Sequence, residues 1–229
     1  LDHAIVHARR EEQQLGLFFL DLDRFKHVND SLGHDVGDLL LINVAERISK
    51  VLKDDDTFAR LGGDEFVIIV EDYADLNQLT HVASQIIAEL AKPFSLTGYE
   101  VSTSTSIGIT VFPNDGQTSQ HLLKNADTAM YHVKAQGRNN FQFYTQSMNV
   151  KAFERLSIEN ELRRAIESQQ FVLHYQPRVN STDGQVASIE ALIRWQHPEK
   201  GLIAPGYFID IAEDSGLIVP MSEWVIKQA

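Results

Sequence analysis

The segment that most constrains this chain is Arg60-Leu61-Gly62-Gly63-Asp64-Glu65-Phe66, followed directly by the apolar run Val67-Ile68-Ile69-Val70. Two adjacent glycines permit a tight turn, so the segment predicts a β-hairpin between residues 57–61 and 65–71. Two neighbouring carboxylates on such a turn are unfavourable unless a cation or a hydrogen-bond donor pairs with them. The hairpin therefore raises the question of whether a second acidic element completes a metal site.

A second acidic element precedes the hairpin in the sequence. Residues 17–20, Leu-Phe-Phe-Leu, are typical of a buried strand, and this strand leads into Asp21-Leu22-Asp23. Acids at a strand end and at a hairpin tip can converge from distant positions. Carboxylate and carbonyl oxygens without His or Cys favour Mg²⁺ or Mn²⁺ over zinc, and such ions recruit phosphates. We therefore expect a metal site made by Asp21, the Leu22 carbonyl, Asp64 and Glu65.

Basic residues that could contact phosphates accompany the acids. Lys26 lies just after the first acidic element, and Lys134 and Arg138 lie at the end of a helix expected over residues 122–136. Cations also favour a helix C-terminus for purely structural reasons. Beside the acidic elements, phosphate contacts are the better interpretation of Lys134 and Arg138.

The overall composition narrows the classes of function. The 229 residues are 43% hydrophobic and 23% charged, which is typical of a globular protein with one large or two ordinary domains. A formal net charge of −12 argues against a surface that coats a nucleic acid polymer or an anionic membrane, but a nucleotide can still bind through a divalent ion. The absence of cysteine excludes disulfides and thiolate metal sites. We expect a cytoplasmic fragment of a longer protein, tethered to a membrane only through segments outside this sequence.

The order of the expected elements predicts an α+β fold. Besides the first strand and the hairpin, the sequence predicts loop structure over residues 31–38, helices over 39–52, 76–91 and 122–136, and strands over 100–112 and 141–144. The resulting β-α-β-β-α-β order is related to the ferredoxin-like split βαβ arrangement, with a central antiparallel sheet flanked by helices. We place this first domain at residues 1–145.

The pattern changes after residue 145. Residues 146–169 are charged and helical, with apolar positions that include Phe153, Leu156, Ile158 and Leu162, and we interpret them as a linker helix. Strands are expected over 171–176 and 186–195, and the sequence ends within a predicted helix. Residues 170–229 are therefore expected to be a small or incomplete second domain.

Four segments together resemble a GGDEF domain, the family that comprises the diguanylate cyclases. They are Phe25-Lys26-His27-Val28-Asn29-Asp30, Gly33-His34-Asp35-Val36-Gly37-Asp38, Gly62-Gly63-Asp64-Glu65-Phe66 and Lys134-Ala135-Gln136-Gly137-Arg138-Asn139. The resemblance implies a palm-type fold and the condensation of two GTP into cyclic di-GMP, with two pyrophosphates released. It also implies a homodimer, because each domain binds one GTP.

The resemblance assigns roles to individual residues. It implies that Asp21, the Leu22 carbonyl and Asp64 hold the metals, and that Asp64 and Glu65 are catalytic. Asn29 and Asp38 would read the guanine edge, although Asn29 could instead be a helix-terminal residue and Asp38 the N-cap of the helix expected from Leu39. His34 is included, although a loop histidine is more often structural. The implied GTP-binding residues are Lys26, Asn29, His34, Asp38, Gly62, Gly63, Lys134 and Arg138.

One position departs from the family pattern. Many such cyclases have an Arg-x-x-Asp site for product inhibition just before the signature, and here the segment reads Lys53-Asp54-Asp55-Asp56. Lysine cannot reproduce the bidentate contact of arginine with phosphate. We therefore predict weak or absent inhibition by cyclic di-GMP.

The C-terminal residues resemble the start of an EAL domain, the family of cyclic di-GMP phosphodiesterases. The matching segments are Tyr175-Gln176-Pro177, Glu190-Ala191-Leu192-Ile193-Arg194-Trp195, and Pro205 with Phe208-Ile209. The resemblance implies a TIM-type barrel in which Glu190 is a metal ligand and Gln176 and Arg194 touch the dinucleotide. Such barrels typically have about 250 residues, so we expect only a truncated start without hydrolytic activity.

Two functions remain open. The first is an active cyclase within a bifunctional GGDEF–EAL signalling protein. The second is a silent GGDEF domain that binds GTP and regulates an adjacent phosphodiesterase. A polymerase palm domain shares the two-metal logic, but the spacing of Asn29, Asp38 and Gly62-Gly63 argues against it.

Overall fold

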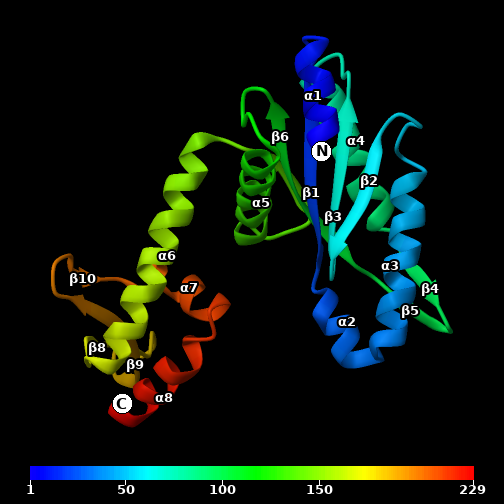
Figure 1. Cartoon of the computed structure of the whole chain (residues 1–229). Coiled ribbons are helices and arrows are strands. Elements are labelled where there is room, and N and C mark those ends of the chain that lie inside the picture. Colours follow the sequence, from blue (N-terminus) through cyan, green and yellow to red (C-terminus); the bar gives the residue numbers. More distant parts are fainter. The chain divides into compact units, whose positions relative to one another are not determined.

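The chain forms two compact units, Leu1–Asn149 and Val150–Ala229, each described by itself. The computed structural model describes the backbone of residues 1–229 (Figure 1). It describes all side chains except those of residues 150–153 and 156. Two expected apolar positions of the linker helix, Phe153 and Leu156, lie outside the described side chains.

A five-stranded sheet in the order β2-β3-β1-β6-β7 forms the centre of the first unit. Neighbouring strands are antiparallel except β6 and β7, which are parallel. All nine residues of β1 are buried, because helices cover both faces of the sheet at its central strand. The α+β prediction is therefore confirmed. The strands are β1 Leu15–Asp23, β2 Thr57–Gly62, β3 Glu65–Glu71, β6 Ser104–Phe112 and β7 Asn140–Phe143.

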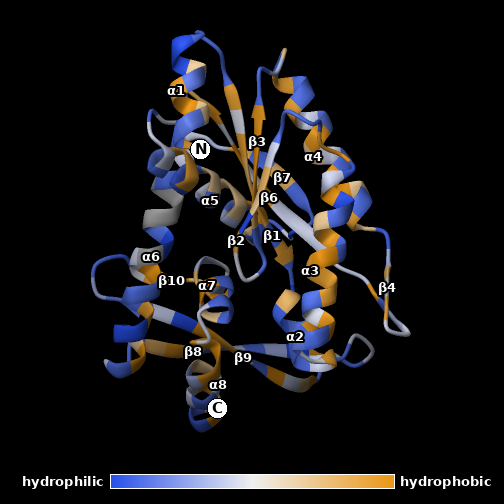
Figure 2. Ribbon diagram, turned by 45° about the vertical axis from the view of Figure 1, so that its right-hand side comes forward, coloured by the Kyte–Doolittle hydropathy of each residue, from blue (hydrophilic) through white to orange (hydrophobic). Residues whose placement is uncertain are grey.

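Alternate residues of β1 pack into two separate apolar cores. Phe18, Leu20 and Leu22 belong to the core beneath α3 and α4, whereas Leu17 and Phe19 belong to the core beneath α1 and α5. Figure 2 shows α3 and α4 on one side of the sheet and α1 and α5 on the other. This division follows from the two-residue period of a strand. The helices of this unit are α1 Asp2–Arg10, α2 Phe25–Leu32, α3 His34–Ser49, α4 Leu76–Leu90 and α5 Ser119–Ala135.

The expected loop over residues 31–38 is wrong. Helix α2 extends to Leu32 and α3 begins at His34, so Gly33 alone separates the two helices. Gly33 adopts φ 89° and ψ 160°, a conformation that a residue with a Cβ rarely adopts, and this permits the sharp corner. The expected helix over residues 39–52 consequently begins earlier and ends at Ser49.

The expected strand over residues 100–112 is divided in two. A small hairpin, β4 Phe94–Leu96 and β5 Tyr99–Val101, precedes β6, and residues 102–103 belong to neither strand. The division occurs where the pairing partner changes from β4 to β1. Thr118 accepts a hydrogen bond from the His121 amide at the N-terminus of α5, so this helix also begins earlier than expected.

The second unit is a three-stranded antiparallel sheet, in the order β10-β9-β8, covered by helices. Ile158, Leu162, Phe171, Trp195 and Phe208 form part of its core. The two predicted strands and the C-terminal helix are confirmed. The elements are α6 Gln146–Glu167, which begins before the boundary between the units, β8 Phe171–Val179, β9 Val186–His197, β10 Gly201–Ile203, a 3₁₀ turn at Pro205–Tyr207, α7 Ile209–Asp214 and α8 Ile218–Gln228.

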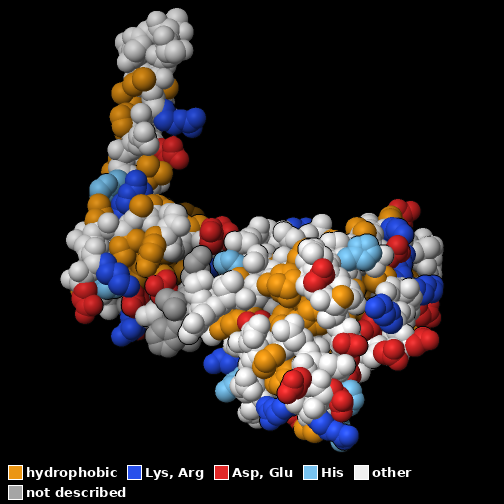
Figure 3. Space-filling model, turned by 90° about the horizontal axis from the view of Figure 1, so that it is seen from above, with side chains coloured by type: hydrophobic (Ala, Val, Ile, Leu, Met, Phe, Trp, Pro, Cys, Tyr) orange, Lys and Arg blue, Asp and Glu red, His pale blue; other side chains and the backbone are white. Residues whose placement is uncertain are grey.

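The exposed surface carries charges of both signs. Figure 3 shows acidic, basic and apolar side chains intermixed on the face in view, without a broad basic area. Among the described residues, no helix combines the length and the apolar character that crossing a membrane requires.

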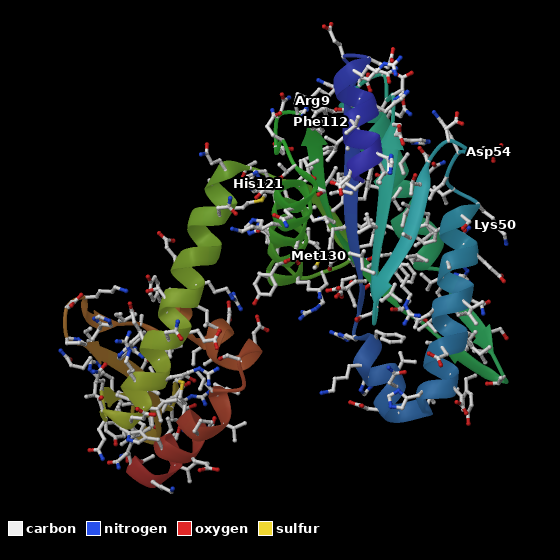
Figure 4. The ribbon with its side chains drawn as sticks, in the orientation of Figure 1. Arg9, Lys50, Asp54, Phe112, His121 and Met130 are labelled. Atoms are coloured by element: carbon white, nitrogen blue, oxygen red, sulfur yellow. The ribbon has the colours of Figure 1, made fainter. Side chains whose placement is uncertain are left out.

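The contact between β6 and α5 gives a test of the fold. A Cβ at Gly108 would lie 1.9 Å from the Ala126 carbonyl oxygen and 2.4 Å from the Met130 amide nitrogen (Figure 4 labels Met130). Gly108→Ala should therefore destabilise the protein by about 3 kcal/mol or more, measured by urea denaturation, because backbone cannot yield as a flexible side chain can. Gly206→Ala, where a Cβ meets no atom within 4 Å, is the control. Equal stability of the two variants would contradict the close packing of α5 on the sheet.

Candidate functional site

The Gly62-Gly63 turn forms the tip of the β2–β3 hairpin, as predicted. Gly62 pairs with Glu65, and the register shifts between Arg60 and Gly62. Gly63 adopts φ 51°, and the Arg60 Nε donates a 2.9 Å hydrogen bond to its carbonyl oxygen. Asp64 lies in the turn and Glu65 begins β3. Gly63 therefore serves the backbone conformation of the turn, and the hydrogen bond from Arg60 stabilises the tip.

The pairing of β1 with β3 brings the two acidic elements together. Asp21 is the register partner of Glu65, and the Leu22 amide nitrogen lies 3.3 Å from the Asp64 carbonyl oxygen that accepts its hydrogen bond. Residues distant in the sequence thus meet at one end of the sheet. The predicted convergence of these elements is confirmed, while the roles of the residues remain predictions.

Asp21 has the most unusual electrostatic environment of this group. Its side chain is 11% exposed, and its Oδ2 lies 2.7 Å from the Lys134 Nζ. The pKa of Asp21 is raised to about 6, chiefly by burial and in smaller part by the charges of Asp64 and Asp23, against the lowering effect of Lys134. The site therefore holds more negative charge than Lys134 alone neutralises.

The available oxygens suit Mg²⁺ or Mn²⁺. No group of three or more His, Cys, Asp or Glu side chains suited to a metal occurs among the described residues. The candidate donors are instead the Asp21 and Asp64 carboxylates and the Leu22 carbonyl. Mg²⁺ usually binds proteins through one or two carboxylates and takes its other ligands from water and substrate phosphates. The donor set and its unneutralised charge therefore fit this ion.

A cleft of about 450 Å³ lies beside Asp38, between α3 and the β2–β3 hairpin. Its walls are largely apolar, with Leu41, Phe58 and Phe66 among the lining side chains, and Arg60 also reaches it. An apolar wall with a carboxylate at one edge suits a planar base that presents N–H donors. Asp38 is a residue of α3 and not its N-cap, which is Gly33.

Asn29 lies where α2 and α3 cross. A Cβ at Gly37 would come 1.8 Å from the Asn29 Oδ1, so the absence of a side chain at Gly37 makes room for Asn29. Among the described side chains, the Asn29 Oδ1 is the one buried polar atom without a hydrogen-bond partner. Asp38 follows Gly37 directly, so the helix crossing brings Asn29 close to Asp38. The alternative reading of both residues as helix caps is wrong for Asp38.

A second cleft, of about 440 Å³, lies at the end of α5. Arg138 lines it together with Arg24 and His27, which the sequence analysis did not assign. Lys134 contacts Asp21 directly and does not line this cleft among its described residues. Lys26 and His34 are exposed on α2 and α3, and neither side chain makes a hydrogen bond or ion pair within the described structure.

Asp23 is the residue that the sequence analysis missed. It is 5% exposed and accepts hydrogen bonds from two hydroxyls on β6 and from the Asn139 amide. It lies two residues after Asp21 and therefore on the same face of β1. The two-residue period of a strand was the signal in the sequence that could have placed Asp23 beside Asp21.

The three candidate residues of the second unit lie on the β8–β9 hairpin. Gln176 and Glu190 are register partners on neighbouring strands, and Arg194 lies further along β9, where its Nη1 donates to the Ile193 carbonyl. Gln176 and Glu190 are exposed. The two neighbouring residues could contact one ligand, and their predicted roles remain predictions.

The pKa of Asp21 gives a test of the site in the absence of metal. A carboxyl with a pKa raised from 3.8 to about 6 binds its proton more tightly in the folded state, so stability falls as the pH rises through this interval. Asp21→Asn should remove this loss. Its free energy of unfolding should be about 3 kcal/mol higher than that of the wild type above pH 7 and equal to it below pH 4. Urea denaturation with a chelator present measures both values. Asp72→Asn, at the exposed far end of β3, is the control, and parallel pH profiles for wild type and Asp21→Asn would contradict the assignment.

Comparison with known proteins identifies the family of each unit. Residues 1–140 match the family described as diguanylate cyclase, GGDEF domain, and residues 159–229 match the EAL domain family. The GGDEF domain of YfiN from Pseudomonas aeruginosa is a similar solved structure, with 41% identity and a TM-score of 0.62 over 63% of this chain and 91% of that one. A GGDEF domain of DgcB from Caulobacter crescentus, solved in complex with c-di-GMP, is 30% identical, with a TM-score of 0.56 over 62% of this chain and 85% of that one.

Relatives of greater length share both units. The bifunctional diguanylate cyclase/cyclic di-GMP phosphodiesterase MucR of Pseudomonas aeruginosa is 48% identical over 100% of this chain and 33% of its own length. The cyclic di-GMP phosphodiesterase PdeR of Escherichia coli is 46% identical over 99% of this chain and 34% of its own length. The chain thus spans about a third of the length of these relatives. It belongs to the GGDEF family, followed by part of an EAL domain, and so to the GGDEF–EAL family of cyclic di-GMP signalling proteins.

Proposed function

We propose that residues 1–145 are an active diguanylate cyclase module that condenses two GTP into cyclic di-GMP and releases two pyrophosphates. The observation that carries the proposal is the meeting of Asp21, Asp64 and Glu65 at one end of the sheet, with Lys134 on Asp21. A buried, incompletely neutralised carboxylate beside a second acid would suit the divalent cations that the condensation requires. The similarity to MucR, whose name states both activities, also supports it.

The residues of the site would act on the nucleotide in distinct ways. Asn29 and Asp38 would bind the guanine edge, and Lys26, Arg138 and Lys134 would bind the phosphates, with Lys134 released from Asp21. Asp21, the Leu22 carbonyl and Asp64 would hold Mg²⁺ or Mn²⁺, which would neutralise the phosphates and acidify the attacking hydroxyl. The oxygen of the 3′-hydroxyl would attack the α-phosphorus while the bond from this phosphorus to the leaving pyrophosphate breaks. Asp64 would accept the proton of that hydroxyl, and Glu65 would support Asp64.

Two copies of the domain are needed for the reaction. Each 3′-hydroxyl attacks the α-phosphorus of the other nucleotide, and one site holds one GTP. The exposed hairpin tip would have to face the tip of a second copy. We therefore propose that the active form is a homodimer and that a monomer binds GTP without turnover.

A second candidate function is a silent regulatory domain. It would bind GTP and adjust the activity of an adjacent EAL phosphodiesterase. The specific observation in its favour is that two relatives of the same architecture, PdeR and NbdA, are named as phosphodiesterases alone, with 46% and 44% identity to this chain. The two functions share the GTP site and differ in turnover.

Incubation of the full-length protein with GTP and Mg²⁺ distinguishes these functions. Wild-type dimer should form cyclic di-GMP, measured by chromatography, and Asp64→Asn should reduce the rate by at least about 100-fold because a metal ligand and proton acceptor is lost. Asp72→Asn, at the other end of β3, is the matched control and should retain full activity. GTP binding without product in a sample that ultracentrifugation shows to be dimeric would instead support the silent domain.

Product inhibition gives an independent prediction. Lys53 and Asp56 precede β2, whereas the Gly62-Gly63 turn follows it, so any inhibitory site is separate from the reaction site. Figure 4 shows Asp54 in the loop that joins α3 to β2. Wild-type activity should respond weakly to added cyclic di-GMP, and Lys53→Arg should increase the inhibition about tenfold by restoring a bidentate phosphate contact. Lys50→Arg, at the end of α3 that leads into this loop, is the control. Strong inhibition of the wild type that Lys53→Ala abolishes would contradict the prediction.

A further inference from the structure

The segment that follows α5 has an unusual backbone. Gly137, Arg138 and Asn139 adopt φ values of 113°, 66° and 49°, so three consecutive residues are left-handed and two of them carry a Cβ. Each such residue is disfavoured and persists only where its surroundings hold it. Arg138 is one of the two, which means that the direction of its side chain depends on this strained conformation.

Asp23 holds this conformation from the end of β1. Its Oδ2 accepts a 3.1 Å hydrogen bond from the Asn139 amide and a 2.5 Å bond from the Ser104 Oγ, and its Oδ1 accepts a 2.7 Å bond from the Ser106 Oγ. The two hydroxyls lie on β6 and fix the carboxylate in turn. The Arg138 amide also donates to the Val133 carbonyl at 3.0 Å, which anchors the segment to the end of α5.

Two aspartates on one face of β1 thus hold the two cationic residues, Lys134 near the end of α5 and Arg138 just after it. Asp21 pairs with Lys134 through an ion pair, which a ligand on either group can exchange. Asp23 instead accepts a hydrogen bond from the backbone amide of Asn139 and two more from the hydroxyls on β6. The first contact can be released while the second remains, so Arg138 keeps its place when Lys134 moves.

Arg138 lines the cleft of about 440 Å³ together with Arg24, His27 and Thr103. Within the described structure, the Arg138 side chain is exposed and has no ion-pair partner. A guanidinium held over a cleft with a second arginine beside it is arranged for an anion with several oxygens, such as the β- and γ-phosphates of a nucleoside triphosphate.

We propose that Asp23 is a positioning residue for phosphate binding: its carboxylate fixes the left-handed Arg138-Asn139 backbone and so presents Arg138 to the terminal phosphates of GTP. This inference rests on the proposed function only for the identity of the nucleotide. Asp23 itself touches neither the nucleotide nor the reacting atoms. A substitution of Asp23 should therefore affect only the binding of the β- and γ-phosphates.

The test compares the binding of GTP and GMP by calorimetry. Asp23→Ala and Arg138→Ala should each weaken GTP binding about tenfold and leave GMP binding unchanged, because GMP lacks the two terminal phosphates. The double variant should bind GTP no more weakly than Arg138→Ala alone. Asp23→Asn keeps an oxygen acceptor for the Asn139 amide and should remain within about twofold of the wild type.

Two further measurements separate positioning from a general structural role. Hydrogen exchange at the Asn139 amide should accelerate in Asp23→Ala and not in Asp23→Asn. Asp115→Ala is the matched control, because that carboxylate also accepts a backbone hydrogen bond, from the Val111 amide at 2.8 Å, but lies at the other end of β6. It should leave the ratio of GTP to GMP affinity unchanged.

Three results would overturn the proposal: unchanged exchange at Asn139 in Asp23→Ala, an equal loss of GTP and GMP affinity, or additive effects of the two alanine substitutions. Failure of the wild type to bind GTP would overturn the proposed function instead. In that case accelerated exchange at Asn139 would still support the role of Asp23 in fixing the backbone.

Discussion

The N-terminal unit depends on one strand that is buried on both faces and ends in acids. The apolar residues of β1 pack into two cores, one on each face of the sheet. This packing fixes the register of β1 against its neighbours, because a shift by one residue would exchange its two faces. That same fixed register places Asp21 opposite Glu65 on one side and opposite Ser106 on the other. The positions of the acids are thus a consequence of hydrophobic packing along the rest of the strand.

The fold tolerates an electrostatic cost at this strand end. Burial of Asp21 near Asp64 and Asp23 disfavours its charged form, and Lys134 compensates only in part. The charged form of this carboxylate lowers the stability of the metal-free protein at neutral pH, so a neutral residue of similar size would suit the metal-free fold better. The oxygen donors and the unneutralised negative charge at this strand end would suit a divalent cation such as Mg²⁺.

The end of the site that is proposed to bind guanine depends on close backbone contacts. Gly33 permits the corner between α2 and α3, and Gly37 lets Asn29 lie against the second helix. The β2–β3 hairpin and α3 then enclose the cleft beside Asp38. At the other end, the left-handed segment after α5 carries Arg138. The cleft beside Asp38 joins α3 to the β2–β3 hairpin, whereas the other features involve residues close to one another in the sequence.

Much of this arrangement was predictable from the sequence. The hairpin at Gly62-Gly63, the α+β class and most of the strands follow from local residue pattern. The convergence of Asp21 with Asp64 was expected for a different reason, because neighbouring acids need a cation, and it is the pairing of β1 with β3 that brings them together. The helix corner at Gly33 was not predictable, because a Gly-His-Asp segment suits a loop equally well and only packing against the sheet favours two helices. The break before β6 was missed for a similar reason, since alternation continues through residues 102–103 although the partner strand changes.

The sequence by itself determined which chemical groups this protein has and the order in which the chain presents them. Only the tertiary structure decided what each group contacts: Lys134 is paired with Asp21, and Asp23 holds the backbone of Asn139. The physical reason is that hydrogen bonds and ion pairs between distant segments depend on strand register and helix packing. Those are set by the burial of the whole apolar surface and not by the residues of the site.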